Sequence, residues 1–245
     1  MNAQDIIIGS GPSGLAAAKA LTAKGRDVLM LDTGLEMDQH AQELRARMGG
    51  AEPGDWSEAD RGAIGAVRRS EKSDSIQPFG SDFLFRLPEE MAAFADRGGV
   101  HGLKPSFARG GLSNGWGASV LPYHARDFEG WPIGLDDLAP HYQAIAPVIG
   151  MAAARDGLAD FYTGVQIKED HPLLQSTQAR ELLGRMEAKS DIFAKLGLHF
   201  GASRQAIASP CRACAMCLYG CPYRLIFNAG DTVEQMAAEG ALRYQ

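Results

Sequence analysis

A glycine pattern near the start of the chain limits its fold more than any other sequence feature. The apolar residues 6–8 lead directly into Gly9-Ser10-Gly11-Pro12-Ser13-Gly14, and the small-residue segment 15–21 follows. A strand, a glycine turn and a helix in this order bring a pyrophosphate onto a helix N-terminus, where backbone N–H groups and the helix dipole favour an anion. We therefore predict cofactor contacts at Gly9, Gly11, Pro12, Ser13 and Gly14.

A second apolar run strengthens this interpretation. Residues 27–31 end at Asp32, close to the offset of roughly 20 residues at which an acid binds the adenosine ribose hydroxyls of a dinucleotide. A carboxylate in this position would also repel a 2′-phosphate. The alternative is an ordinary buried βαβ unit whose glycine turn binds nothing. The sequence predicts an α/β fold with a Rossmann-like start.

Composition excludes several classes of protein. The chain has 245 residues, of which 45% are hydrophobic, and its net charge of -6 gives no reason to expect nucleic acid or an anionic membrane as a partner. No apolar stretch reaches the roughly 18 residues of a membrane span, so we expect no transmembrane segment. Because the first strand starts within the first residues, no room is left for a signal peptide, and we expect a cytoplasmic location.

A second glycine-rich segment, Gly110-Gly111-Leu112-Ser113-Asn114-Gly115-Trp116-Gly117, suits a loop that passes close to a ligand. Its bare backbone amides and the side chains of Ser113 and Asn114 can hydrogen-bond a phosphate or the edge of a heteroaromatic ring. The alternative is a flexible surface turn.

Further motifs carry a resemblance to a known family. The glycine turn and the second loop are followed by Asp127-Phe128, by Trp131-Pro132-Ile133 and by Leu138-Ala139-Pro140-His141-Tyr142. In this order and at about these distances, these motifs resemble the glucose-methanol-choline oxidoreductases. The resemblance covers most of residues 4–150 and implies an enzyme that binds FAD and oxidises alcohols or sugar hydroxyls.

The resemblance also implies how the cofactor is held. By analogy, the ADP half of FAD lies on Gly9, Gly11, Gly14 and Asp32, and the pyrophosphate and flavin lie along Gly110, Gly111 and Ser113, with Asn114 and Trp116 as further contacts. Many members of the family carry Asn where this chain has Trp116, which leaves the flavin contact at that position open.

The chain's four cysteines lie close together in one segment, the cysteine run of residues 211–222. Cys211, Cys214, Cys217 and Cys221 follow the spacing C-x2-C-x2-C-x3-C-P of bacterial ferredoxins. A 4Fe–4S cluster could take all four thiolates. Alternatively, a 3Fe–4S cluster could use Cys211, Cys217 and Cys221, whose C-x5-C-x3-C-P spacing resembles that of some dehydrogenases of the same family.

Three other states of the cysteines stay open. Free structural thiols are the strongest of these alternatives. Zinc fits less well because four-cysteine zinc sites separate their two pairs by a longer loop. Two disulfides within so short a segment would be strained, and they would be unusual in the cytosol.

We expect a Rossmann-like FAD-binding fold with mostly helical insertions that is incomplete in this chain. The predicted helices are 42–48, 135–146, 176–196 and 231–240, and the predicted later strands are 79–85 and 241–245. The charged run 68–74 is most simply a solvated surface. The predicted segments are the nucleotide-binding unit 1–34, an insertion 35–105, the second loop and Trp-Pro region 106–150, a helical segment 151–205, the cysteine segment 206–228, and a final helix and strand 229–245.

The predicted function is that of an FAD-dependent dehydrogenase. The whole enzyme would transfer a hydride from an alcohol or sugar carbon to flavin, and electrons would leave through the iron-sulfur cluster to an external acceptor, a protein or a quinone. We name no catalytic residue, because the base lies outside this chain, in the remainder of the enzyme or in a partner chain. The alternatives are a non-catalytic electron-transfer subunit and an NAD-linked reductase.

Overall fold

The computed structural model describes residues 4–69, 76–89, 105–167 and 171–245. The chain divides into two compact units. Unit 1 contains Met1–Gly117, Cys214–Arg224 and Asn228–Gln245, and unit 2 contains Ala118–Ala213 and Leu225–Phe227. Unit 1 is therefore built from both ends of the chain.

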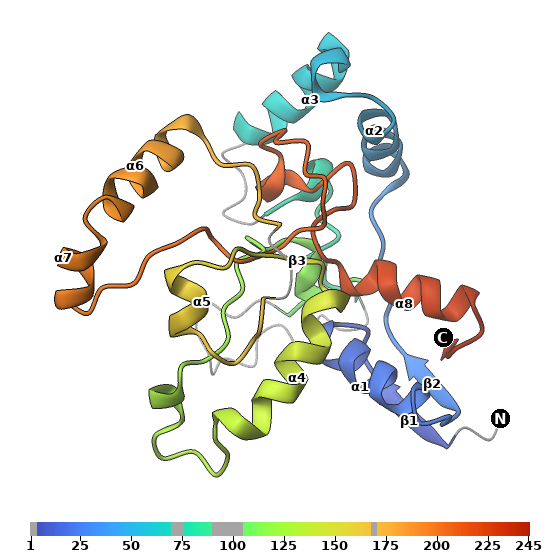
Figure 1. Cartoon of the computed structure of the whole chain (residues 1–245). Coiled ribbons are helices and arrows are strands. Elements are labelled where there is room, and N and C mark those ends of the chain that lie inside the picture. Colours follow the sequence, from blue (N-terminus) through green and yellow to red (C-terminus); the bar gives the residue numbers. More distant parts are fainter. Residues whose placement is uncertain (1–3, 70–75, 90–104, 168–170) are drawn as a thin grey trace. The chain divides into compact units, whose positions relative to one another are not determined.

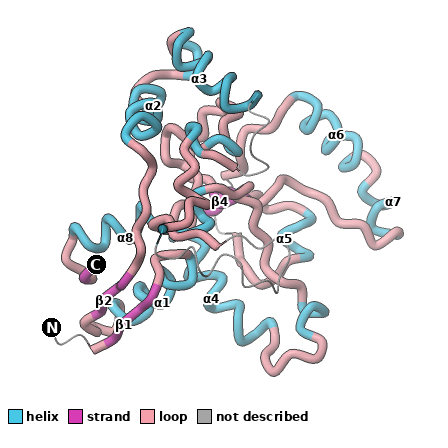
Figure 2. Tube along the Cα trace, turned by 180° about the vertical axis from the view of Figure 1, so that it is seen from behind, coloured by secondary structure: helices cyan, strands magenta, loops and turns pink. Residues whose placement is uncertain are grey.

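The central element of unit 1 is a parallel sheet. Its described strands are β1 (Asp5–Ile8), β2 (Val28–Leu31) and β5 (Arg243–Tyr244), in the order β1-β2-β5. Figure 2 shows β1 and β2 side by side, with the C-terminus close to them. The β-branched and aliphatic residues of these strands favour extended backbone, and Val28 and Met30 of the middle strand are fully buried.

Two helices connect the strands of this sheet. Helix α1 (Pro12–Thr22) follows β1, and α8 (Ala229–Ala238) precedes β5 and packs against α1 (Figure 1). This is a Rossmann-like α/β fold, in which two helical crossovers join three parallel strands. The second crossover is interrupted by a long insertion, because the chain leaves β2 at Asp32 and returns to the sheet only through α8.

The part of this insertion that belongs to unit 1 forms a separate hydrophobic core. It contains α2 (Gln39–Gly49), α3 (Glu58–Arg69) and the short 3-10 helices η1 (Pro53–Asp55), η2 (Pro78–Gly80), η4 (Gly111–Asn114) and η6 (Cys217–Tyr219). Leu44, Met48 and Leu84 are almost inaccessible to solvent in this core, and Met216 of the cysteine run is buried with them. The part of the cysteine run that belongs to unit 1, residues 214–222, is thus anchored in this core.

Unit 2 is mostly helical. Its elements are η5 (Ala125–Phe128), α4 (Leu135–Val148), β3 (Met151–Ala152), α5 (Gly157–Phe161), α6 (Thr177–Glu187), α7 (Ser190–Lys195) and β4 (Gln205–Ala206), with β3 antiparallel to β4. The buried guanidinium of Arg204 binds both carboxylate oxygens of Asp156, at 2.5 and 3.0 Å. This ion pair fixes the segment before β4 to the N-terminus of α5. Within the described residues, no helix combines the length and the apolar character that a membrane span needs.

Several predicted elements are confirmed with shifted boundaries. Helix α2 begins three residues earlier than predicted. Helix α8 begins at Ala229, before the predicted start at Asp231, because the side chain of Asn228 caps it by accepting a hydrogen bond from Gly230 N at 2.8 Å. Helix α4 starts at Leu135 as predicted and continues through Pro140 to Val148. The final strand pairs with β2 as β5.

Two predictions are wrong. The single helix predicted over 176–196 is two helices, α6 and α7, which are separated at Ala188 and Lys189. The strand predicted over 79–85 is a 3-10 turn followed by irregular chain, in which Phe79 has φ +51° and is buried together with Phe83. The alternating aromatic residues fill a core here, and tertiary packing decides their conformation. The charged run 68–74 lies almost wholly outside the described residues, and no side chain of it is described.

Candidate functional site

The glycine turn adopts the geometry that its sequence predicts. Gly9 has φ +92°, a conformation that favours glycine. A Cβ on Gly14 would overlap the carbonyl oxygen of Gly9 and would lie 3.4 Å from Ile7 Cγ2, so Gly14 lets α1 lie close against β1. Gly11 has φ -62°, and a Cβ added there would have no atom within 4 Å, so this side of Gly11 faces open space.

The N-terminus of α1 is available to an anion. Gly11 is the N-cap residue and offers no side chain that could satisfy the first backbone N–H groups of the helix. Pro12 occupies the first turn, and that turn contains no acidic residue. The helix dipole therefore meets no protein carboxylate within this turn, and Ser13 and Gly14 carry the first N–H groups of the helix.

Ser10 joins the glycine turn to the second loop. This side chain is only 1% exposed; its hydroxyl donates to Asp32 Oδ2 and accepts a hydrogen bond from Gly110 N at 2.8 Å. The two glycine segments also approach each other directly, since a Cβ on Gly111 would lie 3.4 Å from Gly11 Cα. The structure thus brings together segments that are far apart in the sequence and that were predicted to contact one cofactor.

The second loop is held from its other side by α8. Gly110 has φ +87°, and a Cβ there would lie 2.5 Å from Gly230 N. Ser113 is buried; its hydroxyl donates to Gly110 O at 2.6 Å and accepts from Ala229 N at 2.9 Å. These contacts hold the loop against α8 and direct the Ser113 side chain into the protein.

Asn114 also supports the loop from within. Its amide nitrogen donates to Arg109 O at 2.8 Å and to Gly111 O at 2.7 Å, and its amide oxygen accepts from Asn228 Nδ2 at 2.8 Å. Trp116 lies at the end of the same loop and is partly exposed. The loop can therefore offer a ligand backbone groups and the Trp116 ring, while the polar side chains of Ser113 and Asn114 stabilise its shape.

Asp32 lies where the prediction placed it, at the end of β2. Its Oδ2 accepts hydrogen bonds from Ser10 and from the Tyr244 hydroxyl, the latter at 3.0 Å. Burial and the adjacent Asp32 carboxylate raise the pKa of Tyr244 well above its usual value, so Tyr244 stays a neutral donor. Both donors act on one oxygen, which leaves Oδ1 to accept hydrogen bonds from a ribose.

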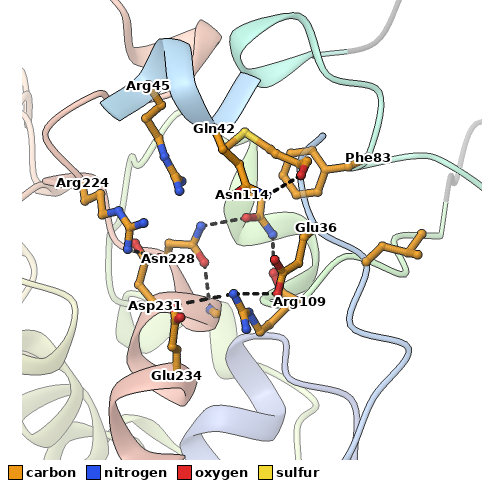
Figure 3. A pocket seen from close by; sticks show the side chains of 13 residues that line it. Glu36, Gln42, Arg45, Phe83, Arg109, Asn114, Arg224, Asn228, Asp231 and Glu234 are labelled. Atoms are coloured by element: carbon orange, nitrogen blue, oxygen red, sulfur yellow. Dashed lines mark hydrogen bonds and ion pairs between the residues drawn. The ribbon is translucent and has the colours of Figure 1, made fainter. Parts of the chain in front are cut away.

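A polar pocket of about 140 Å³ lies beside the second loop (Figure 3). Its charged lining residues are Glu36, Arg45, Arg109, Arg224, Asp231 and Glu234. Arg109 binds Glu36 at 3.0 Å and lies 3.6 Å from Glu234, so the charged side chains on this side of the pocket are paired with one another.

The described residues of the cysteine run form no metal site. Cys211 belongs to unit 2, whereas Cys214, Cys217 and Cys221 belong to unit 1. Among the described residues, no three His, Cys, Asp or Glu side chains are placed to share a metal ion, and no disulfide joins the four cysteines. Ala213 and Ala215 have φ of +50° and +58°, so the backbone between the first three cysteines changes direction sharply.

Comparison with known proteins supports the nucleotide-binding interpretation. Residues 7–37 match the family model of an NAD(P)-binding Rossmann-like domain. The matched segment contains the second half of β1, together with the glycine turn, α1, β2 and Asp32. No curated protein matches the chain. The match and the parallel sheet indicate a domain that binds a dinucleotide cofactor, as in oxidoreductases.

The sequence analysis missed three residues of the site. Ser10 was predicted only as part of the glycine turn, Asn228 only as the end of the cysteine segment 206–228, and Tyr244 only as part of the final strand. A small polar residue between two turn glycines is a weak signal for Ser10, and an Asn directly before a small-residue helix is a capping signal for Asn228. Nothing in the sequence places Tyr244 next to Asp32, because only the return of β5 to the sheet does so.

Proposed function

We propose that this chain is the FAD-binding part of a dehydrogenase related to the glucose-methanol-choline oxidoreductases, acting on an alcohol or sugar hydroxyl. The observation that carries the proposal is the hydrogen bonding of Ser10, which joins the glycine turn to the second loop and to Asp32. A Rossmann turn alone suits any dinucleotide. A second glycine loop fixed against that turn favours the extended FAD-binding arrangement implied by the sequence resemblance.

The residues present fit such a cofactor. Gly11 leaves open space in front of the N-terminus of α1, where a pyrophosphate can reach backbone N–H groups without meeting a Cβ. Asp32 has a carboxylate oxygen available for the ribose hydroxyls, and the Gly110–Gly111 backbone lies beside the turn.

When bound, the flavin would accept a hydride from the carbinol carbon. The residues of this chain bind and orient the cofactor, and we assign the proton-accepting base to a part of the enzyme outside this chain.

The test is a titration of the purified full chain with FAD, followed by flavin fluorescence. Wild type is expected to bind FAD, and Gly11→Ala is expected to weaken binding by about tenfold or more, because its new methyl group lies between backbone and phosphate. Since Gly11 has φ -62° and open space, the same substitution should change the free energy of unfolding by no more than about 1 kcal/mol.

The matched control is Gly184→Ala on α6, where a Cβ also meets nothing within 4 Å. This variant should bind FAD as wild type does. A wild-type chain that takes up no FAD would refute the proposal, and unchanged binding by Gly11→Ala would refute the assigned position of the pyrophosphate.

A second candidate is an NAD-linked reductase, which the matched NAD(P)-binding model favours. The same titration with NAD+ and NADH distinguishes the two. A chain that binds NADH with a saturable fluorescence change and does not bind FAD would establish this alternative.

We extend the proposal to the cysteine run, as the site of an iron-sulfur cluster, a group that would supply one-electron chemistry when bound. Its support is the ferredoxin-like spacing of Cys211, Cys214, Cys217 and Cys221. Because the described structure does not gather these side chains, we derive no electron-transfer step through them. Iron and sulfide analysis of anaerobically purified protein, with an EPR spectrum, tests this part separately: protein that contains neither element would refute it.

A further inference from the structure

The polar pocket in Figure 3 contains one arginine, Arg45, that has no counter-ion among the residues the structure describes. Of the other two arginines that line it, Arg109 binds Glu36 and lies near Glu234, and Arg224 binds Asp231 at 3.3 Å. Each of the three acidic residues of the lining therefore forms an ion pair with Arg109 or Arg224. Arg45 makes no ion pair or hydrogen bond with any described residue, and Asp231 and Glu234 attract it only from a distance. The lining has as many carboxylates as arginines, but the hydrogen-bond donors of this one guanidinium are unused.

The surroundings of Arg45 are unfavourable for its positive charge. The side chain extends from α2 toward Asn228 and the N-terminus of α8, with Arg224 close by (Figure 3). Burial, together with the repulsion of Arg224 and Arg109, lowers the pKa of Arg45 despite the attraction of Asp231 and Glu234, so the net surroundings disfavour the cation. A partly buried charge without a partner costs free energy, and a bound anion would remove that cost.

We propose that this pocket binds a phosphate group, held by the guanidinium groups of Arg45 and Arg224. The two side chains come from different elements, α2 and the segment after the cysteine run, and enter the cavity separately. A phosphate presents three or more oxygens in different directions and can accept hydrogen bonds from both planar guanidinium groups. A carboxylate has only two coplanar oxygens and fits two separate forks less well. The cavity of about 140 Å³ has room for one phosphate and part of its substituent.

The phosphate has two possible sources, which share this chemistry. It belongs either to the bound dinucleotide or to a separate phosphorylated small molecule. Asn114 of the second loop and Arg109, which directly precedes that loop, both line the pocket, so the pocket adjoins the proposed cofactor site. The proposal itself does not require that the cofactor is FAD, because its first test uses cofactor-free protein.

That test measures the thermal unfolding midpoint of the cofactor-free full chain in sodium phosphate and in sodium chloride at equal ionic strength. Phosphate at about ten times its Kd is expected to raise the midpoint by about 3 °C. Arg45→Gln should abolish this shift, and Arg45→Lys, which keeps the charge but not the planar fork, should reduce it. Arg185→Gln, an equal change of charge on the exposed surface of α6, should leave the shift as in wild type.

The source is then identified by repeating the measurement with FAD bound. Loss of the phosphate shift, together with weaker FAD uptake by Arg45→Gln, assigns the group to the cofactor. Persistence of the shift assigns it to a separate ligand. The proposal is overturned if wild type shows no phosphate-specific shift, if Arg45→Gln retains the full shift, or if acetate stabilises the protein equally. None of these overturning results depends on FAD uptake.

Discussion

Replacing Ser10 with alanine tests whether the two glycine segments act as one site. Ser10 is 1% exposed, and its hydroxyl is the described partner of Gly110 N, at 2.8 Å, and a donor to Asp32. Ser10→Ala removes this hydroxyl without changing the backbone. Gly110 is itself buried, so its N–H group would have no water to bond to.

The expected cost follows from these contacts. A buried amide that loses its partner costs about 1–3 kcal/mol, and Asp32 keeps the hydrogen bond from Tyr244. We therefore expect the free energy of unfolding to fall by about 2 kcal/mol. For a chain of this size, that corresponds to a midpoint lower by about 4–8 °C. FAD affinity should fall as well, because the second loop would no longer be fixed against the glycine turn.

Urea unfolding followed by circular dichroism measures the stability change, and the FAD titration measures the change in affinity. Ser190→Ala is the matched control, because Ser190 is exposed at the start of α7 and its substitution should change stability by no more than about 0.5 kcal/mol. Combining Ser10→Ala with Asp32→Asn in a double-mutant cycle should show a coupling of about 0.5–3 kcal/mol.

The reasoning is refuted if Ser10→Ala unfolds at the same urea concentration as Ser190→Ala and binds FAD with wild-type affinity. That result would mean that the Gly110 amide finds another partner and that the loops are positioned independently. A coupling of zero in the double-mutant cycle would refute the Ser10–Asp32 contact alone.

Two further substitutions test the packing around the site and in unit 2. Gly14→Ala would place a methyl group against Gly9 O, and we expect a loss of about 1–3 kcal/mol in urea unfolding, whereas Gly184→Ala, which meets no atom, should not destabilise the protein. Burial raises the pKa of Asp156, but the hydrogen bonds from Arg204 and from Ala202 N outweigh this effect and hold the pKa below its usual value of 3.8. The ion pair should therefore contribute fully above about pH 4, and its contribution should be lost as the pH falls through the lowered pKa. Asp156→Asn should lower the free energy of unfolding by about 3 kcal/mol at pH 7, and it should reduce the loss of stability that wild type shows as the pH falls below about 4. An unchanged loss of stability at acid pH would contradict the role given to the Arg204–Asp156 ion pair.

Local features of the sequence were sufficient to predict the nucleotide-binding unit. The apolar runs, the glycine turn and Asp32 predicted β1, α1 and β2 because turn formation and strand pairing there involve neighbours in the sequence. The capping and glycine signals likewise predicted α2, α4 and α8. Residues 79–85 show where local patterns fail, since an alternating apolar pattern describes a strand and a folded core segment equally well.

The sequence by itself determined that this chain begins with a Rossmann turn suited to an anionic ligand, because a tight turn, a close phosphate approach and an uncapped helix each require particular residues. Only the tertiary structure decided which distant segments lie against that turn. Ser10 meets Gly110, Tyr244 meets Asp32, and Arg45 faces the N-terminus of α8 because β5 and α8 return to the sheet after the long insertion. Such contacts depend on the path of the whole chain, and no local pattern encodes them.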